Sequence, residues 1–87
     1  MDSNTNAFST LLARLRARPG DADLHYRLAR FYMGAGEFPQ AIVEMRRALE
    51  INPKDAHVKR DLAQALSEHG RVTEARQMVA EIMRGGN

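Results

Sequence analysis

Residues 22–53 read ADLHYRLARFYMGAGEFPQAIVEMRRALEINP and decide the fold of the chain. Apolar residues in each half recur at helical spacing, which gathers them on one side of a helix that turns about 100° per residue. Gly36 can adopt the positive φ that ends the first helix, and Pro39 suits the first turn of the next, where an N–H group would be unpaired anyway. The stretch therefore predicts a helical hairpin. Its apolar positions are Leu24, Leu28, Phe31 and Tyr32 in the first helix and Phe38, Ala41, Ile42, Met45, Ala48 and Leu49 in the second.

Helical patterns continue on both sides of this hairpin. A first helix is expected to start at Thr5 or Asn6, either of which can cap it, and to run to about Arg18. A fourth helix is expected to end at Gly70, and a fifth to cover residues 73–84. The expected organisation is a flexible N-terminus at 1–6, a single folded domain at 7–84 and a flexible tail at 85–87.

The chain repeats itself at one interval. Asp21 and Asp55 each follow a proline by two residues, and each can cap the helix that comes after it. Nine pairs of identical residues share an offset of 34, all at small, apolar, capping or helix-ending positions. The pairs are Pro19 and Pro53, Asp21 and Asp55, Ala22 and Ala56, Leu28 and Leu62, Ala29 and Ala63, Gly36 and Gly70, Ala41 and Ala75, Ala7 and Ala41, and Leu15 and Leu49.

A helix–turn–helix unit of this period resembles the tetratricopeptide repeat family. The resemblance implies an all-α, right-handed superhelix of five helices, with a half repeat at 7–21, repeat one at 22–55 and repeat two at 56–84. His25 and Lys59 stand where the family usually has tryptophan, so each hairpin buries less aromatic surface. The residues that carry the resemblance are Leu28, Ala29, Tyr32, Gly36, Phe38, Ala41, Ala48 and Pro53 in repeat one and Leu62, Ala63, Leu66, Gly70, Val72 and Ala75 in repeat two.

The resemblance also implies a binding groove, because this family usually holds peptides or helices along the inner curve of its superhelix. In each full repeat, residues of the first helix that point away from the apolar stripe are expected to line it. Arg30 and Arg60 can clamp a carboxylate, which predicts an acidic partner segment or a free C-terminal carboxylate. The alternative is an ordinary solvated face. The expected groove residues are Tyr26, Arg30, Met33, Arg60, Gln64 and Ser67, with Arg27, His57 and Asp61 at the margins.

The fifth helix is expected to present an apolar face that no later helix covers. Stacked hairpins bury their apolar side only against a neighbour, so such a face predicts self-association, most simply a symmetric dimer, or docking onto a larger partner. The alternative is that this helix packs inward and leaves a modest patch. The expected interface residues are Met78, Val79, Ile82 and Met83.

Composition and motifs favour a non-enzymatic interaction module or adaptor without a cofactor. Thirteen basic and eleven acidic residues give a net charge of +2, which is too small to indicate a polyanion partner. The chain has no Cys, and its histidines, His25, His57 and His69, lack metal-ligand spacing. No arrangement of nucleophile and base and no phosphate-binding loop is recognisable. Glu44 stands among arginines and is expected on a solvated face.

The N-terminal sequence gives no sign of targeting. It lacks the basic start and apolar centre of a secretion signal, and no apolar run in the chain approaches membrane-spanning length. These features, together with the absence of Cys, predict a cytoplasmic protein without a membrane partner.

Single-stranded nucleic acid is the rival class of ligand. Arg14, Arg16 and Arg18, together with Arg46 and Arg47, are expected to form a basic edge, and helical repeats can read single-stranded RNA. Only five aromatic residues occur in the chain, and Tyr26 alone is placed to stack on a base. The composition therefore favours a protein partner over a nucleic acid.

Overall fold

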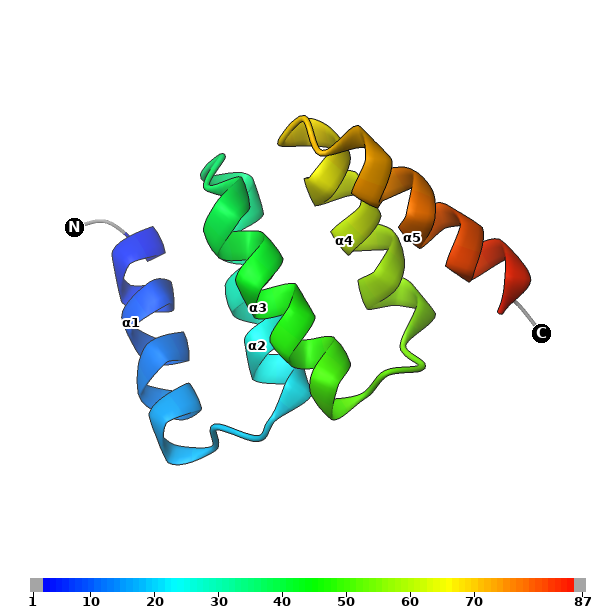
Figure 1. Ribbon diagram of the computed structural model, residues 1–87. Helices are drawn as coiled ribbons and strands as arrows, with labels where there is room; N and C mark the ends of the chain where they lie inside the picture. Colours follow the sequence, from blue (N-terminus) through cyan, green and yellow to red (C-terminus); the bar gives the residue numbers. More distant parts are fainter. Residues whose placement is uncertain (1–2, 86–87) are drawn as a thin grey trace.

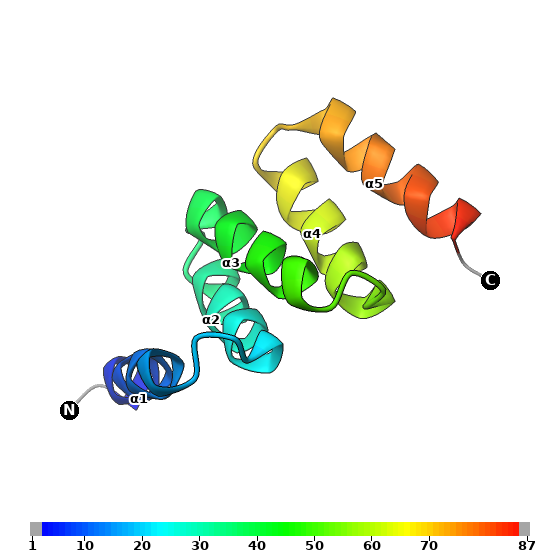
Figure 2. The ribbon, with the colours of Figure 1, turned by 60° about the horizontal axis from the view of Figure 1, so that its bottom comes forward.

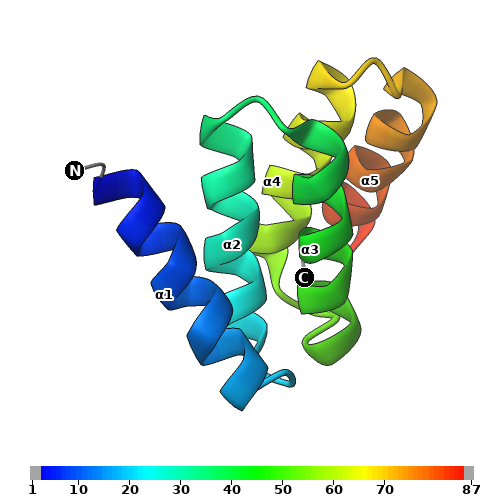
Figure 3. The same cartoon turned by 90° about the vertical axis from the view of Figure 1, so that its left-hand side faces the viewer.

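The computed structural model describes residues 3–85, and these form five α-helices and no strand (Figure 1). The helices are α1 (Ser3–Ala17), α2 (Ala22–Gly34), α3 (Phe38–Ile51), α4 (Ala56–Glu68) and α5 (Val72–Arg84). Helices α2 and α3 form one antiparallel hairpin, α4 and α5 form the next, and α1 lies alongside α2 (Figures 1 and 3). The all-α arrangement of five helices expected from the sequence is confirmed.

Helix ends follow the signals in the local sequence. The carboxylate of Asp21 accepts hydrogen bonds from the backbone N–H groups two and three residues later, at 3.0 and 3.3 Å. Asp55 does the same at 3.0 and 3.2 Å, so both full repeats begin with the same cap. Gly36 and Gly70 follow α2 and α4 with φ of 74° and 82°, a conformation that residues with a Cβ rarely adopt. Pro39 lies in the first turn of α3, as expected.

Two helix boundaries differ from the expected ones. Helix α1 begins at Ser3, so Thr5 and Asn6 belong to its first turns and do not cap it. Residues 3–6 contain no Gly or Pro that would stop the helix, which explains its earlier start. Helix α5 begins one residue before the expected Thr73. Of the two terminal segments expected to be flexible, residues 1–2 and 86–87 lie outside the described part of the chain.

The helices stack in the order of the chain. The extensive contacts all join consecutive helices, and Figure 2 shows them stepping from α1 to α5. The resulting body is elongated, with extents of 43 × 25 × 15 Å. One core cluster nevertheless links the two hairpins, because the side chains of α4 pack on the first hairpin as well as on α5. Its buried members are Ala29, Ile42, Met45, Ala48, Val58, Leu62, Ala65, Leu66 and Ala75.

A buried polar pair inside the first hairpin corrects one expectation. Glu44 is only 7% exposed, and it does not lie on a solvated face. Its Oε1 lies 2.8 Å from Nδ1 of the buried His25, whose Nε2 lies 2.7 Å from the carbonyl oxygen of Pro19. Arg47 donates to Glu44 Oε2 at 2.9 Å. The carboxylate is tolerated inside the hairpin because each of its oxygens has a partner.

Candidate functional site

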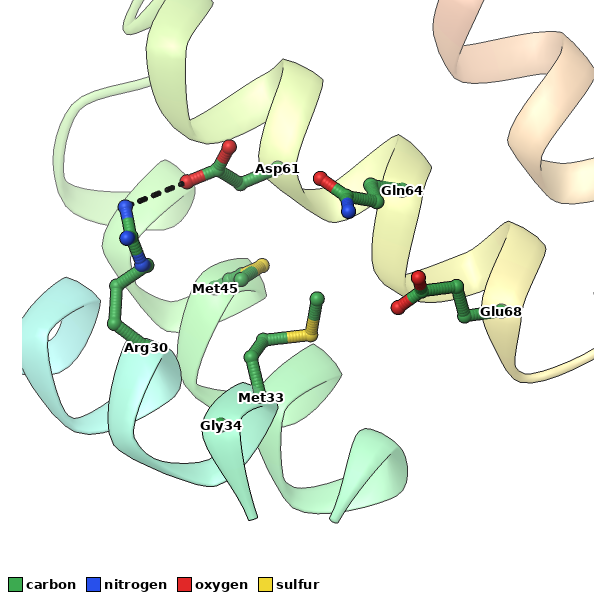
Figure 4. Close-up of a pocket in the computed structure, with 7 residues that line it drawn as sticks. All are labelled: Arg30, Met33, Gly34, Met45, Asp61, Gln64 and Glu68. Carbon is green, nitrogen blue, oxygen red and sulfur yellow. Dashed lines mark ion pairs between the residues drawn. The ribbon is translucent and has the colours of Figure 1, made fainter. Parts of the chain in front are cut away.

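A pocket of about 370 Å³ lies where the first hairpin meets α4; we call it the junction pocket (Figure 4). Met33 and Met45 contribute its apolar part, and Arg30 faces Asp61 across one side. Polar and apolar groups thus meet in one small space, which suits a ligand segment that carries both. The pocket is lined by Arg30, Met33, Gly34, Met45, Asp61, Gln64 and Glu68.

A hydrogen-bonded group beside this pocket joins α2 to α4. Tyr26 donates from its hydroxyl to Asp61 Oδ2 at 2.5 Å, and Arg30 donates to the Tyr26 hydroxyl oxygen at 3.0 Å. Arg30 Nη1 also lies 3.7 Å from Asp61 Oδ2, and its guanidinium lies over the Tyr26 ring. Partial burial, followed by the bond to Asp61, raises the pKa of the Tyr26 hydroxyl above its ordinary value of 10.0. The hydroxyl therefore remains a donor at neutral pH.

A second, larger hollow of about 630 Å³ lies between α4 and α5; we call it the α4/α5 groove. Its surface is mainly apolar, and Val72 and Val79 on α5 are 52% and 46% exposed. An apolar surface of this kind, bordered by arginines, fits the side of an amphipathic helix. The groove is lined by Arg60, Ala63, Gln64, Ser67, Val72, Ala75, Arg76, Val79 and Ile82.

The predicted groove residues are divided between these two sites. Arg30 and Met33 line the junction pocket with Tyr26 beside it, whereas Arg60 and Ser67 line the α4/α5 groove. Gln64 lines both. The sequence reasoning placed all six opposite the core, but α4 packs on the first hairpin, mainly on α3, and is bonded to α2 through Tyr26 and Asp61. Tyr26 and Met33 are therefore partly buried against the core cluster.

The four predicted interface residues also separate. Met78 is partly buried against the core cluster and lies on a different side of α5 from Val79. Val79 and Ile82 line the α4/α5 groove, and Met83 is 78% exposed. Helix α5 thus packs inward along one side and leaves a second apolar side open within the described chain.

Three of the residues expected to favour nucleic acid have neighbours that occupy them: Arg46, Arg47 and Tyr26. Arg46 pairs with Glu74 at 2.8 Å, and Arg47 pairs with Glu44 at 2.9 Å, so both already have carboxylate partners. The Tyr26 ring is bordered by Arg30 and by His57, whose ring centroid lies 5.6 Å away. It is therefore not an open platform for a base.

Two further kinds of site were considered in the part of the chain that the structure covers, a metal site and a membrane-spanning helix. Among residues 3–85, no cluster of three His, Asp or Glu side chains could hold a metal ion. Over the same range, every helix is too short or too polar to cross a bilayer.

Sequence reasoning missed the closeness of His25 to Glu44 and the part that Asp61 plays at the junction. The first pair comes from two helices of one hairpin, and its spacing of 19 residues matches no periodic pattern. Tyr26 and Asp61 are 35 residues apart, one more than the repeat period. That offset places them on neighbouring first helices, and it is the signal that could have identified the pair.

The chain matches two family profiles described as tetratricopeptide repeat, one over residues 33–85 and the other over residues 6–56. Each covers more than half of the chain. The chain belongs to the tetratricopeptide repeat family. This membership makes it a helical-repeat module for contacts between proteins, and it confirms the resemblance inferred from the 34-residue period.

Solved structures place the same fold in a longer protein. A crystal structure of MamA protein superposes with a TM-score of 0.88 at 21% identity, covering 97% of this chain and 46% of that one. Two structures of MamA AMB-1 give TM-scores of 0.85 and 0.86 at 24% identity, covering 94% and 97% of this chain and 48% and 50% of theirs. The chain thus spans about half the length of these proteins. A comparison with curated proteins finds no match.

Proposed function

We propose that this chain is a non-enzymatic adaptor that binds a peptide or helix of a partner protein at the junction pocket. The observation that carries the proposal is the meeting of a polar pair, Arg30 and Asp61, with the flexible side chain of Met33. Methionine adapts its shape to many apolar side chains, and the paired charges offer both a donor and an acceptor to a ligand backbone. Arg60, Gln64 and Ser67 extend this binding surface along α4.

A ligand carboxylate is best supported beside Arg60. Arg30 already has Asp61 as a partner, and Glu68 adds a second negative charge to the junction pocket. Arg60 takes part in none of the ion pairs found among residues 3–85. An acidic segment or a free C-terminal carboxylate therefore gains most by lying with its charge toward Arg60.

Self-association through α5 completes the proposal. The support is the exposure of Val79 and Met83 on the open side of this helix. Apolar side chains gathered on one helix face favour contact with another apolar surface.

The adaptor function can be tested with peptides selected from a random display library. Arg30→Glu is expected to weaken the affinity of selected peptides by about tenfold or more, because it removes the donor and places two carboxylates side by side. Arg27→Glu is the matched control, because Arg27, which was expected at the groove margin, lines neither the junction pocket nor the α4/α5 groove. Arg27 lies on the same helix, with a side chain that is 58% exposed against 60% for Arg30, and has its own partner in Asp23.

Equal loss of affinity in both variants, or a library that yields no binding peptide, would contradict the proposal. Titration of random single-stranded RNA against salt covers the rival ligand. Tight RNA binding that falls steeply with ionic strength would favour phosphate recognition instead.

A further inference from the structure

The α4/α5 groove repeats a surface that is already filled elsewhere in the molecule. In repeat one, the corresponding surface on α2 and α3 receives α4. Six of the nine residues that line the α4/α5 groove lie 34 positions after residues of α2 and α3 that pack in the same core cluster as α4. The residues of the filled surface that pack in the same core cluster as α4 are Ala29, Ile42, Met45 and Ala48, with Tyr26 and Met33 partly buried at its edge.

The two surfaces differ in what covers them. Met45 is 0% exposed, whereas Val79 at the equivalent position is 46% exposed. Phe38 is half-buried, and its equivalent Val72 is 52% exposed. The groove therefore has the apolar lining of a surface on which a following helix packs; we call such a surface a helix seat. No helix of the described chain occupies it.

The helix that fills the seat in repeat one sets the requirements for an occupant. Helix α4 packs there with Val58, Leu62, Ala65 and Leu66, which follow the spacing 0, 4, 7 and 8. Helix α5 carries the same spacing in Ala75, Val79, Ile82 and Met83. A second copy of α5 therefore presents apolar side chains in the order that the seat receives.

The relative direction of the helices independently supports this occupant. Helices α3 and α4 run antiparallel where α4 lies on the first hairpin (Figure 1). A two-fold axis across α5 makes the two copies of this helix antiparallel as well, so each copy of α5 meets the other as α4 meets α3. With Val79 at the axis, the small Ala75 of one copy lies opposite the large, 78% exposed Met83 of the other.

We propose that two copies of this chain form a symmetric dimer in which each α5 lies in the α4/α5 groove of the other. The proposal rests on the self-association named above and specifies its geometry. One apolar surface acts as both seat and occupant, which is the property of an isologous interface. The pairing closes on itself, so it gives dimers and not chains of molecules.

Sedimentation equilibrium tests the dimer. The wild-type chain is expected to be dimeric at micromolar concentration, and Val79→Glu is expected to weaken dimerisation by about a hundredfold or more, because it buries two unpaired carboxylates at the axis. Val43→Glu is the matched control, since Val43 is also 46% exposed but lies on α3 and lines neither site. Circular dichroism confirms that both variants are folded.

A cross-link tests the position of the axis. The natural chain contains no Cys, so Val79→Cys introduces a single thiol. Oxidation is expected to give a covalent dimer with Val79→Cys and none with Val43→Cys, because a disulfide needs Cβ atoms within about 4.5 Å.

Three results would overturn the proposal: a wild-type monomer, open-ended oligomers, or equal behaviour of the variants at Val79 and Val43. The dimer covers Arg60 and Ser67, which line the α4/α5 groove, so peptide binding along α4 competes with dimerisation. Peptide affinity is therefore measured in parallel on Val79→Glu, which leaves the residues of the junction pocket and Arg60 unchanged. Retained peptide binding with no wild-type dimer would reject the dimer alone, whereas loss of the Arg30 effect would reject the adaptor function alone.

Discussion

Met45 in α3 and Val79 in α5 stand at the same place in the 34-residue repeat, yet the first is 0% exposed and the second 46%. Their own hairpins are built alike, with the same Asp caps and the same positive-φ glycines. What separates them is the helix that follows, because α4 covers Met45 and nothing in the described chain covers Val79. In a stacked repeat, burial is thus decided by the neighbour and not by the residue's own hairpin.

The two repeats also differ in polarity at one matched pair of positions. Repeat one has His25 and Glu44, bonded to each other and buried, and repeat two has Lys59 and Met78. The buried pair fixes one hairpin by directional hydrogen bonds, while the other relies on apolar contact. Substitutions at matched positions therefore measure what each repeat depends on.

The largest difference in the free energy of unfolding is expected between Met45→Ala and Val79→Ala. Loss of the buried methionine leaves a cavity between the hairpins and is expected to lower the free energy of unfolding by about 2–5 kcal/mol. Val79→Ala removes a half-exposed side chain and is expected to cost less than about 1 kcal/mol in the monomer. Urea unfolding at a dilute concentration measures both. Similar losses would mean that the two positions have equivalent surroundings after all.

The next effect concerns His25. His25→Leu leaves the buried Glu44 with Arg47 as its remaining side-chain partner, and is expected to cost about 2–3 kcal/mol. The double change His25→Leu with Glu44→Met, which gives this hairpin the methionine of repeat two, is expected to cost less than the sum of the two single changes. Strict additivity in a double-mutant cycle would show that the pair is not coupled.

The two Asp caps test whether both hairpins begin in the same way. Asp21→Ala and Asp55→Ala are each expected to lower the free energy of unfolding by about 1 kcal/mol, because both carboxylates accept the same two backbone N–H bonds. Asp23→Ala is the control: among residues 3–85 this exposed side chain forms an ion pair only with Arg27, and an exposed pair of this spacing contributes about 0.3–0.5 kcal/mol. Markedly unequal cap effects would show that the two hairpins do not begin alike.

The smallest expected effect is the pH dependence of the free energy of unfolding that Tyr26 causes. Repeat two has no tyrosine at the equivalent position. The pKa of Tyr26 is raised in the folded chain, so the unfolded chain loses this proton first as the pH rises. The contribution of Tyr26 to stability is complete below its ordinary pKa of 10.0 and falls as the pH passes through the folded value. Tyr26→Phe is expected to show a shallower loss of stability as the pH rises above about 10, measured by urea unfolding at a series of pH values. An unchanged slope in Tyr26→Phe would contradict this assignment.

Much of the fold could be predicted from the sequence, because caps, glycines and apolar spacing act within one helix or one turn. Asp21, Gly36 and Pro39 all behave as expected. The candidate site was harder to predict, since its composition depends on how the helices pack on one another. The packing of α4 on the first hairpin divided the expected groove residues, and the packing of α2 against α3 buried Glu44 beside His25. No single-helix pattern contains either contact.

The elongated body, in which extensive contacts join only successive helices, makes stability a local property. Helix α5 can open while α2 and α3 stay paired, because in the described chain its extensive contacts are with α4 alone. Amide protons of α5 should then exchange with solvent sooner than those of α3. A ligand that binds to α5 is expected to slow amide exchange in α5 and to leave exchange in α1 unchanged. Ligand binding can therefore be detected from the difference in exchange rates between the two ends of the chain.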